Sequence, residues 1–326
     1  MRASIDKRHE RAKPNSASQR LLVSGRCDVR DLGEGRIMSN VFEPMAPAEQ
    51  ARFRTAYLAY LQRRDGVPDM KTQRFDVRER FFAELDATPS VWIGTPPVNQ
   101  RVFDRNHARR MPEPNLDEVT LWALATAKTN RAERYGVEYA LVYNDRSLNA
   151  ANDPHAYIQI EEFYHTRILR DALATIGLRM EMGRPSLTTR TLVRAMVRLP
   201  EKYANVVVLC GEICGVAVFS LLLEKARELF AHQPKVLARH EKLFGQIMVD
   251  EVGHVHFVRS GLSPQRLAWA RLILPFVAWG LLEDSPELSR LFGREEIMRR
   301  ILEADVDSAA ASYPDRFQLA AGFTPA

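Results

Sequence analysis

Two short stretches of the sequence place a glutamate three residues before a histidine. Glu162 precedes His165, and Glu251 precedes His254 about ninety positions later. Both stretches have helical patterning, and residues three apart on a helix share one face at a separation of about 5 to 6 Å. Each stretch therefore presents a carboxylate and an imidazole together, which is half of a binding site for a pair of metal ions.

A further carboxylate lies in the most apolar segment of the chain. Glu212 is the only charged residue between Ala204 and Leu223. A lone buried carboxylate is costly unless it forms an ion pair or binds a metal. A buried ion pair is the alternative, but beside the two Glu-x-x-His pairs we predict that Glu212 is a metal ligand.

The fourth carboxylate expected of such a site is Glu133 or Glu138, both in the segment 117–144. A helical wheel places apolar and small residues around Glu133, whereas Glu138 shares its face with bases, and a charged stripe is usually solvated. A helix rises about 1.5 Å per residue. If this helix ends near Asn144 and the next begins near Pro154, Glu138 lies closer than Glu133 to the level of Glu162 along the bundle axis. We predict Glu133, with Glu138 as the alternative.

The acids just before two of these glutamates, Glu161 and Asp250, point sideways from the ligand face. They could accept the second N–H of the histidine on the neighbouring helix and so fix its tautomer. The alternative is that both are ordinary polar helix positions. Two other histidines, His240 and His256, are predicted to be structural or exposed rather than ligating.

A small residue next to this site could leave room for a substrate. Gly215 follows Glu212 by three residues, and Val208 and Phe219 continue the same helical face. We predict a substrate-binding pocket at these three residues, with close helix packing at Gly215 as the alternative.

Four long helical segments must position these side chains. They cover about 117–144, 153–176, 201–231 and 234–261. The third is apolar on nearly every face, which is typical of a helix surrounded by others. Shorter helices are expected at 47–66, 76–87, 264–282 and 286–305, a loop followed by a short basic helix within 178–199, and a proline-rich connector at 88–116. With no strand pattern evident, we predict an all-α single domain, 41–326, built as a four-helix bundle with flanking helices.

The overall charge comes mainly from the N-terminal part. The net charge is +5 and residues 1–36 hold nine Lys or Arg against five acids. We therefore predict a basic flexible tail at 1–40 and no nucleic-acid partner, since the rest of the chain is nearly balanced. An acidic carrier protein is an alternative partner for the tail. No apolar signal segment is evident, so a cytoplasmic location is expected.

The strongly apolar run 272–282 is too short to cross a bilayer, which needs about 20 residues. No membrane span is expected. The apolar helix 267–282 instead suggests a surface for a homodimer. The three cysteines, Cys27, Cys210 and Cys214, are predicted to be reduced core thiols.

In order, the chain has Glu133 (or Glu138), Glu162-x-x-His165, Glu212 and Glu251-x-x-His254, and this series resembles the ferritin-like diiron carboxylate superfamily. Within it, the chain looks most like the p-aminobenzoate N-oxygenase (AurF-like) arylamine oxygenases. Those oxygenases carry a third histidine four residues before the last ligand glutamate, where this chain has Ile247.

The resemblance implies a ferritin-like bundle that holds two iron ions, with manganese or a mixed pair as alternatives. It implies O2 as co-substrate, oxidation of a small organic molecule such as an aryl amine, and an external reductase or ferredoxin as electron donor, since the chain has no flavin or nicotinamide motif. Alternatives are another diiron hydroxylase, oxidase or desaturase, or an iron-handling protein of the ferritin type.

Overall fold

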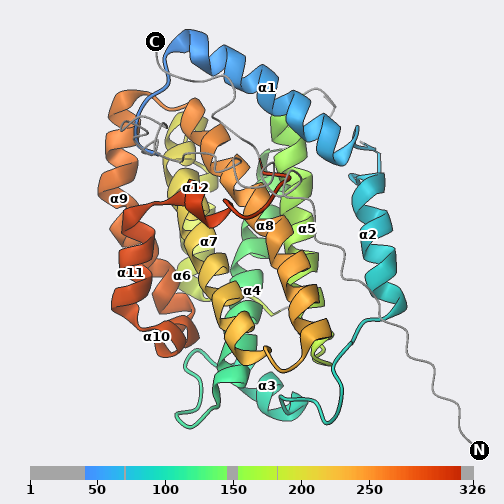
Figure 1. The fold of residues 1–326 in the computed structure, drawn as a ribbon. Helices are drawn as coiled ribbons and strands as arrows, with labels where there is room; N and C mark the ends of the chain where they lie inside the picture. The colour runs from blue at the N-terminus through green and yellow to red at the C-terminus, as the bar shows by residue number, and fades with distance from the viewer. Residues whose placement is uncertain (1–40, 70, 145–152, 182, 317–326) are drawn as a thin grey trace, which may run out of the picture. The chain divides into compact units, whose positions relative to one another are not determined.

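Helices make up all the regular secondary structure of the described residues. The computed structural model describes residues 41–316, apart from 70, 145–152 and 182. These residues form twelve α-helices and no strand (Figure 1). The prediction of an all-α fold is confirmed. The predicted tail, residues 1–40, and Cys27 within it lie outside the described residues.

Four long helices carry the predicted ligands. They are α4 (Glu118–Asn144), α5 (Pro154–Thr175), α7 (Glu201–Leu229) and α8 (Pro234–Ser260). Helix α4 packs against α5, α5 against α8, α8 against α7, and α7 against α4, so the four helices enclose a common interior (Figure 1). Only residues 230–233 join α7 to α8, so these two helices run in opposite directions.

Local signals set both ends of α5. The Asp153 carboxylate accepts a hydrogen bond from the His155 backbone N–H at 3.0 Å, and Pro154 occupies the first turn, where no N–H is needed. Past the helix end, Gly177 has φ +84°, a conformation that residues with a side chain rarely adopt. These limits fix the register in which Glu162 and His165 face the interior.

Helix α7 is long and strongly apolar. Among the described residues it alone is long and apolar enough to cross a membrane, but 67% of its apolar window is buried inside the protein, as in a core helix. Cys210 and Cys214 on this helix are free and buried, as predicted.

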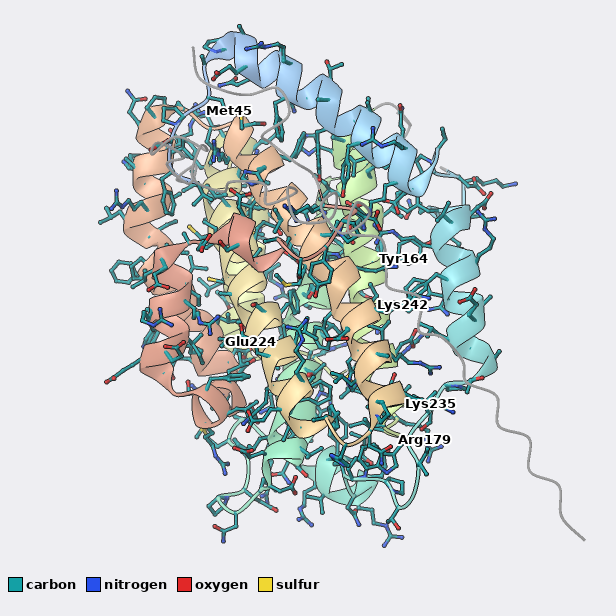
Figure 2. The ribbon with its side chains drawn as sticks, viewed as in Figure 1. Met45, Tyr164, Arg179, Glu224, Lys235 and Lys242 are labelled. Atoms are coloured by element: carbon teal, nitrogen blue, oxygen red, sulfur yellow. The ribbon has the colours of Figure 1, made fainter. Side chains whose placement is uncertain are left out.

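Two N-terminal helices lie beside the four long ones. Helix α1 (Pro47–Asp65) packs against α5 and α8, and α2 (Asp76–Ala87) packs against α1. Tyr164 of α5 accepts a hydrogen bond from the Phe75 backbone N–H at 3.1 Å and donates one to Glu79 at 2.8 Å. Figure 2 labels Tyr164 between α5 and α2. This contact holds α2 beside α5.

The remaining helices are short or lie outside the ring of four. They are α3 (Gln100–His107), α6 (Leu187–Val197), α9 (Pro264–Asp284), α10 (Pro286–Phe292), α11 (Arg294–Glu303) and α12 (Val306–Ala309). Two differ from expectation. Helix α3 lies inside the predicted connector, where the Asn99 side chain caps it. The helix expected at 286–305 is broken because Gly293 has φ +80°.

Candidate metal centre

The two Glu-x-x-His pairs face each other between α5 and α8. The rings of His165 and His254 are both fully buried, with centroids 5.6 Å apart. His165 Nδ1 lies 3.3 Å from Glu251 Oε1, and His254 Nδ1 lies 3.0 Å from Glu162 Oε1. Each histidine therefore lies close to the glutamate of the opposite helix, and the two pairs form one cluster.

Helices α4 and α7 each add one carboxylate to this cluster. Glu133 Oε1 lies 3.4 Å from His165 Nδ1, and Glu212 Oε2 lies 3.6 Å from His254 Nδ1. Two groups have donor atoms that all lie within 4.8 Å of one another, as a shared metal ion requires: Glu162, Glu212, Glu251 and His254, and Glu133, Glu162 and His165. Glu162 belongs to both groups, so two adjacent metal positions would share it.

The structure brings Glu133 into the cluster and leaves Glu138 outside. Glu138 has a side chain that is 49% exposed and pairs with Arg134, one turn earlier on the same helix, at 2.5 Å. Five residues along a helix correspond to a rotation of about 140° from the starting face, so both glutamates cannot point to the same interior. The direction in which the side chain points therefore decides between the two glutamates, and the position of Glu138 along the helix axis does not.

The acids before the predicted ligands hold the far side of each imidazole. His165 Nε2 lies 3.0 Å from Asp250 Oδ2, and His254 Nε2 lies 2.9 Å from Glu161 Oε2. Each histidine is thus held by the acid that precedes the ligand glutamate of the other helix. Because a carboxylate accepts hydrogen bonds, a ring proton belongs on Nε2, and Nδ1 faces the cluster, where its lone pair would bind a metal ion.

Three buried polar atoms point into the cluster without a hydrogen-bond partner among the described residues. They are His165 Nδ1, His254 Nδ1 and Glu133 Oε1. An unpaired buried acceptor is costly, and a metal ion is a partner that such lone pairs can bind. Carboxylate oxygens with one imidazole per position suit iron or manganese better than metals that prefer thiolates. The donor set therefore fits a dimetal centre.

Two arginines that the sequence did not single out surround the orienting acids. Arg78 of α2 is only 2% exposed, and it donates to Asp250 at 2.7 Å, to Glu161 at 3.0 Å and to Asp65 at 2.8 Å. Arg64 of α1 also donates to Asp250 and lies 3.6 Å from Glu161. One guanidinium thus bridges the two acids that hold the two histidines.

The sequence does carry a signal for Arg78. It lies four residues before the buried Phe82 on α2, so it occupies the face of the helix that packs inward. A base on that face must meet buried acids. Which acids these are depends on how α2 docks, and local patterning does not reveal that.

Burial and mutual repulsion shape the charges of the cluster. Burial raises the pKa of Glu133 to about 7, with Glu162 and Glu212 adding to the rise and His165 opposing it. Burial and the neighbouring Glu212 charge hold the pKa of Glu251 well above its usual range. Acids that resist ionisation together are stabilised as carboxylates by a bound cation.

The orienting acids differ from each other in charge state. Burial alone would raise the pKa of Asp250, but Arg64 and Arg78 outweigh it and hold that pKa well below its usual range. For Glu161, burial and the Asp250 charge raise the pKa to about 7, although His254 and Arg78 oppose the rise. The two arginines therefore keep Asp250 ionised, whereas Glu161 resists ionisation.

The predicted substrate pocket is not evident at the three residues proposed for it. A Cβ atom on Gly215 would lie 3.0 Å from Glu251 Oε2, so the space beside this glycine is taken up by the Glu251 carboxylate. Phe219 is 2% exposed and Val208 is half-buried. Gly215 therefore makes room for a predicted ligand, and a substrate pocket at these positions stays a prediction.

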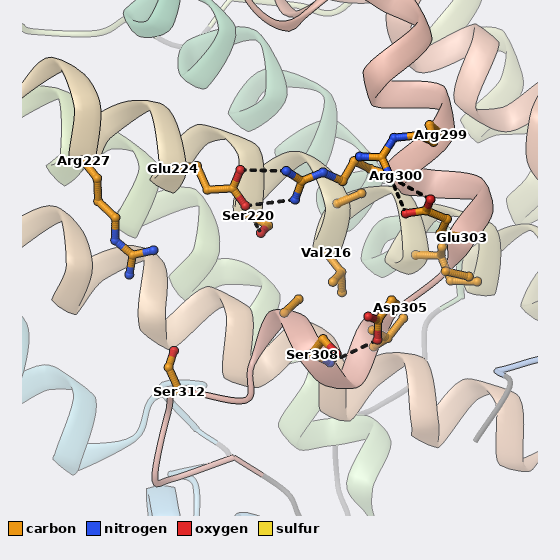
Figure 3. Close-up of a pocket in the computed structure, with 15 residues that line it drawn as sticks. Val216, Ser220, Glu224, Arg227, Arg299, Arg300, Glu303, Asp305, Ser308 and Ser312 are labelled. Atoms are coloured by element: carbon orange, nitrogen blue, oxygen red, sulfur yellow. Dashed lines mark hydrogen bonds and ion pairs between the residues drawn. The ribbon is translucent and has the colours of Figure 1, made fainter. Parts of the chain in front are cut away.

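A cavity of about 400 Å³ lies on the side of α7 that α11 and α12 cover (Figure 3). Val216 forms part of its wall, one helical turn after Glu212. Its rim is polar, and Arg300 donates to both carboxylate oxygens of Glu224 at 2.9 and 3.0 Å. The three predicted pocket residues, Gly215, Val208 and Phe219, do not line this cavity.

Two further histidines take structural roles. His240 Nε2 lies 2.9 Å from the Ala172 carbonyl oxygen, and His256 Nε2 lies 2.8 Å from Asp307. Both rings are buried, and neither belongs to the metal-ligand groups.

Comparisons of the chain with protein-family models, with curated proteins and with solved structures found no match. The function is therefore argued from the residues of this chain.

Proposed function

We propose that the protein is a ferritin-like dimetal oxygenase that uses two iron ions and O2 to oxidise a small organic substrate. The observation that carries this proposal is the crossed arrangement of the two histidines. Each Nε2 is held by an acid of the opposite helix, and each Nδ1 is left without a hydrogen-bond partner among four carboxylates. Both nitrogens face a common centre in which carboxylate oxygens lie 3.0 to 3.6 Å from them, the arrangement that a pair of metal ions needs.

Six residues would hold the metal ions. Glu133 and His165 would bind one ion, and Glu212, Glu251 and His254 the other, with Glu162 within reach of both. Bound iron would pass electrons to O2, which is the oxidant for the substrate. The chain itself supplies the geometry of the ligands and the acids that hold Nε2 of each histidine.

N-oxygenation of an aryl amine is the reaction that the sequence resemblance suggests. Ile247 occupies the position at which those oxygenases carry a third histidine, and its side chain is fully buried on the turn before Glu251. An isoleucine cannot bind a metal. This chain would therefore work with two histidine ligands, and its substrate is left open to the wider class of small amines and hydrocarbons.

Electrons would come from a separate reductase or ferredoxin. The chain would load metal alone, whereas turnover would need this donor.

The deciding experiment measures metal and O2 chemistry in the same sample. Purified protein is analysed for iron and manganese, then stripped of metal, reloaded anaerobically with ferrous iron and exposed to O2. We expect about two metal ions per chain, as two adjacent positions imply, and an iron-dependent visible absorption band after O2 exposure. His254→Ala should lose about one of the two ions and the absorption band. Stoichiometric iron that reacts with O2 but accumulates as ferric mineral would favour iron handling instead, and failure to bind two ions would overturn the proposal.

A further inference from the structure

The outward face of α9 is covered by large apolar side chains. Trp269, Leu272, Phe276 and Trp279 are 54%, 68%, 72% and 52% exposed. They recur at intervals of three and four residues, so they share one side of the helix, opposite buried residues such as Leu274 and Ala278. The helix thus has two apolar faces, of which only one is used by the core.

This surface continues onto α6 and the start of α7. A Cβ atom on Gly280 of α9 would lie 4.0 Å from Leu192 of α6, and the ring of Tyr203 stacks on Trp269 with centroids 6.1 Å apart. Leu199, between α6 and α7, is 43% exposed. We call these seven side chains the α6/α9 patch: Leu192, Leu199, Tyr203, Trp269, Leu272, Phe276 and Trp279. Exposed apolar side chains that gather on one face mark a contact surface more often than scattered ones do.

Bases flank the α6/α9 patch. The stretch 184–203 contains five Lys or Arg and a single acid, and α9 adds Arg266 and Arg271, one on each side of its apolar stripe. Lys202 Nζ lies 5.2 Å above the Tyr203 ring, and the Arg266 guanidinium lies 6.0 Å from it. Among the described residues, the bases Arg198, Lys202, Arg266 and Arg271 form no ion pair with a carboxylate. Their positive charge is therefore not neutralised within the described part of the chain.

We propose that the α6/α9 patch docks the protein on the surface of an anionic lipid bilayer. A helix that lies in the membrane interface combines Trp, Phe and Leu on its buried side with Lys and Arg at its edges, which reach the lipid phosphates. Tryptophan is also the side chain enriched at the boundary between headgroups and acyl chains. The α6/α9 patch combines exposed apolar side chains, bases at its edges and two tryptophans.

The charges distinguish this occupant from a second copy of the chain. A second copy would bring the same excess of bases to the contact, because Glu283, the acid on this face of α9, already pairs with Arg294 at 3.2 Å. An anionic bilayer supplies the opposite charge to every flanking base. The docking is peripheral, because only one face of α9 is exposed, and it does not depend on the proposed dimetal function.

Vesicle binding by the full-length chain tests the proposal. Co-sedimentation is measured with vesicles of phosphatidylcholine alone and with vesicles containing phosphatidylglycerol, at low and high salt. We expect binding to the anionic vesicles that weakens at high salt. The double variant Phe276→Ser/Trp279→Ser and the double variant Arg266→Gln/Arg271→Gln should each weaken binding about tenfold or more. Leu302→Ser, at an apolar position of α11 that is 48% exposed, is the matched control and should bind as the wild type does.

A second measurement uses the unmodified chain, so it does not depend on how the variants fold. Tryptophan emission should shift to shorter wavelength with anionic vesicles and be quenched by lipids brominated in the acyl chain, because Trp269 and Trp279 enter the interface. Equal binding to neutral and anionic vesicles would overturn the proposal. A second outcome would also overturn it: light scattering shows a stable dimer, and Phe276→Ser/Trp279→Ser converts that dimer to a monomer. The patch would then be an interface between copies of the chain.

Discussion

Asp250 Oδ2 lies 3.0 Å from His165 Nε2, although the two residues belong to different helices and Asp250 is the direct neighbour of the predicted ligand Glu251. On the other side of the cluster, Glu161 holds His254 at 2.9 Å in the same way. Each helix therefore supplies a glutamate to the centre and an acid to the histidine of its partner. A change in the spacing of α5 and α8 alters both histidines at once.

Asp250→Asn should weaken metal binding while the fold is retained. The amide can still approach His165 Nε2, but it carries no charge to stabilise the proton there and can present its NH2 group instead of an oxygen. We expect metal affinity to fall about tenfold to a hundredfold, the usual effect of losing such an acceptor. Competition with a chelator of known affinity measures this. Asp307→Asn is the control, because Asp307 makes the same kind of contact to His256, which lies outside the cluster; equal losses in both variants would contradict the prediction.

Arg78→Gln should lower stability by about 3 to 5 kcal/mol, because it removes the buried partner of Asp65, Glu161 and Asp250. Only Arg64 would then oppose those three negative charges. Urea unfolding measured by circular dichroism gives the change in the free energy of unfolding. Arg80→Gln, two residues along the same helix at an exposed position, should change stability by less than about 0.5 kcal/mol. A similarly small effect at Arg78 would show that the network is not a stabilising one.

Glu133→Gln and Glu138→Gln separate the two candidates on α4. Glu133 reaches His165, whereas Glu138 pairs with Arg134 at the surface. We expect Glu133→Gln to lose about one of two bound ions or bind it far more weakly, and Glu138→Gln to keep both. Elemental analysis after desalting counts the ions. The reverse result would mean that Glu138, not Glu133, is the ligand.

The sequence alone was enough to predict an all-α chain and the residues that converge at its centre. Glu162, His165, Glu251 and His254 are set by helical spacing, and Glu212 is conspicuous because its surroundings are apolar, so local rules were sufficient. The wheel around Glu133 was informative for the same reason.

Features that depend on docking between distant segments could not be predicted in this way. Arg64 and Arg78 reach Asp250 across 186 and 172 residues of chain, and no local pattern records those contacts. The role of Gly215 also required the structure. Its missing side chain suggested room for a substrate, but the neighbour that fills this space is Glu251, which comes from another helix.

Gly215→Ala should disturb the centre, whereas Gly211→Ala on the same helix should not. An added Cβ at Gly215 would lie 3.0 Å from Glu251 Oε2 and 3.3 Å from its Cδ, so the carboxylate must move, while a Cβ at Gly211 meets nothing within 4 Å. We expect Gly215→Ala to weaken metal binding about tenfold, on the scale of other changes beside a ligand. Gly211→Ala should bind metal normally and be up to about 1 kcal/mol more stable, because alanine favours a helix. Calorimetric titration with metal and urea unfolding measure the two effects. Identical metal affinities would contradict the assigned role of Gly215.

Stability should fall in mild acid because His240 is buried in its neutral form. Burial lowers its pKa to about 4, and its Nε2–H donates to the Ala172 carbonyl. In the unfolded chain the pKa is about 6.5, so between pH 6.5 and 4 the unfolded state binds a proton that the folded state does not, and stability is lost as pH falls. The full difference of about 2.5 pKa units corresponds to roughly 3 kcal/mol in the free energy of unfolding. Between pH 7 and pH 4.5, the stability lost by His240→Gln should therefore be about 2 kcal/mol smaller than that lost by the wild type. Urea unfolding at the two pH values measures this, with His232→Gln at an exposed histidine as the control. If His240→Gln and the wild type lost equal stability, His240 would not be the source of the acid sensitivity.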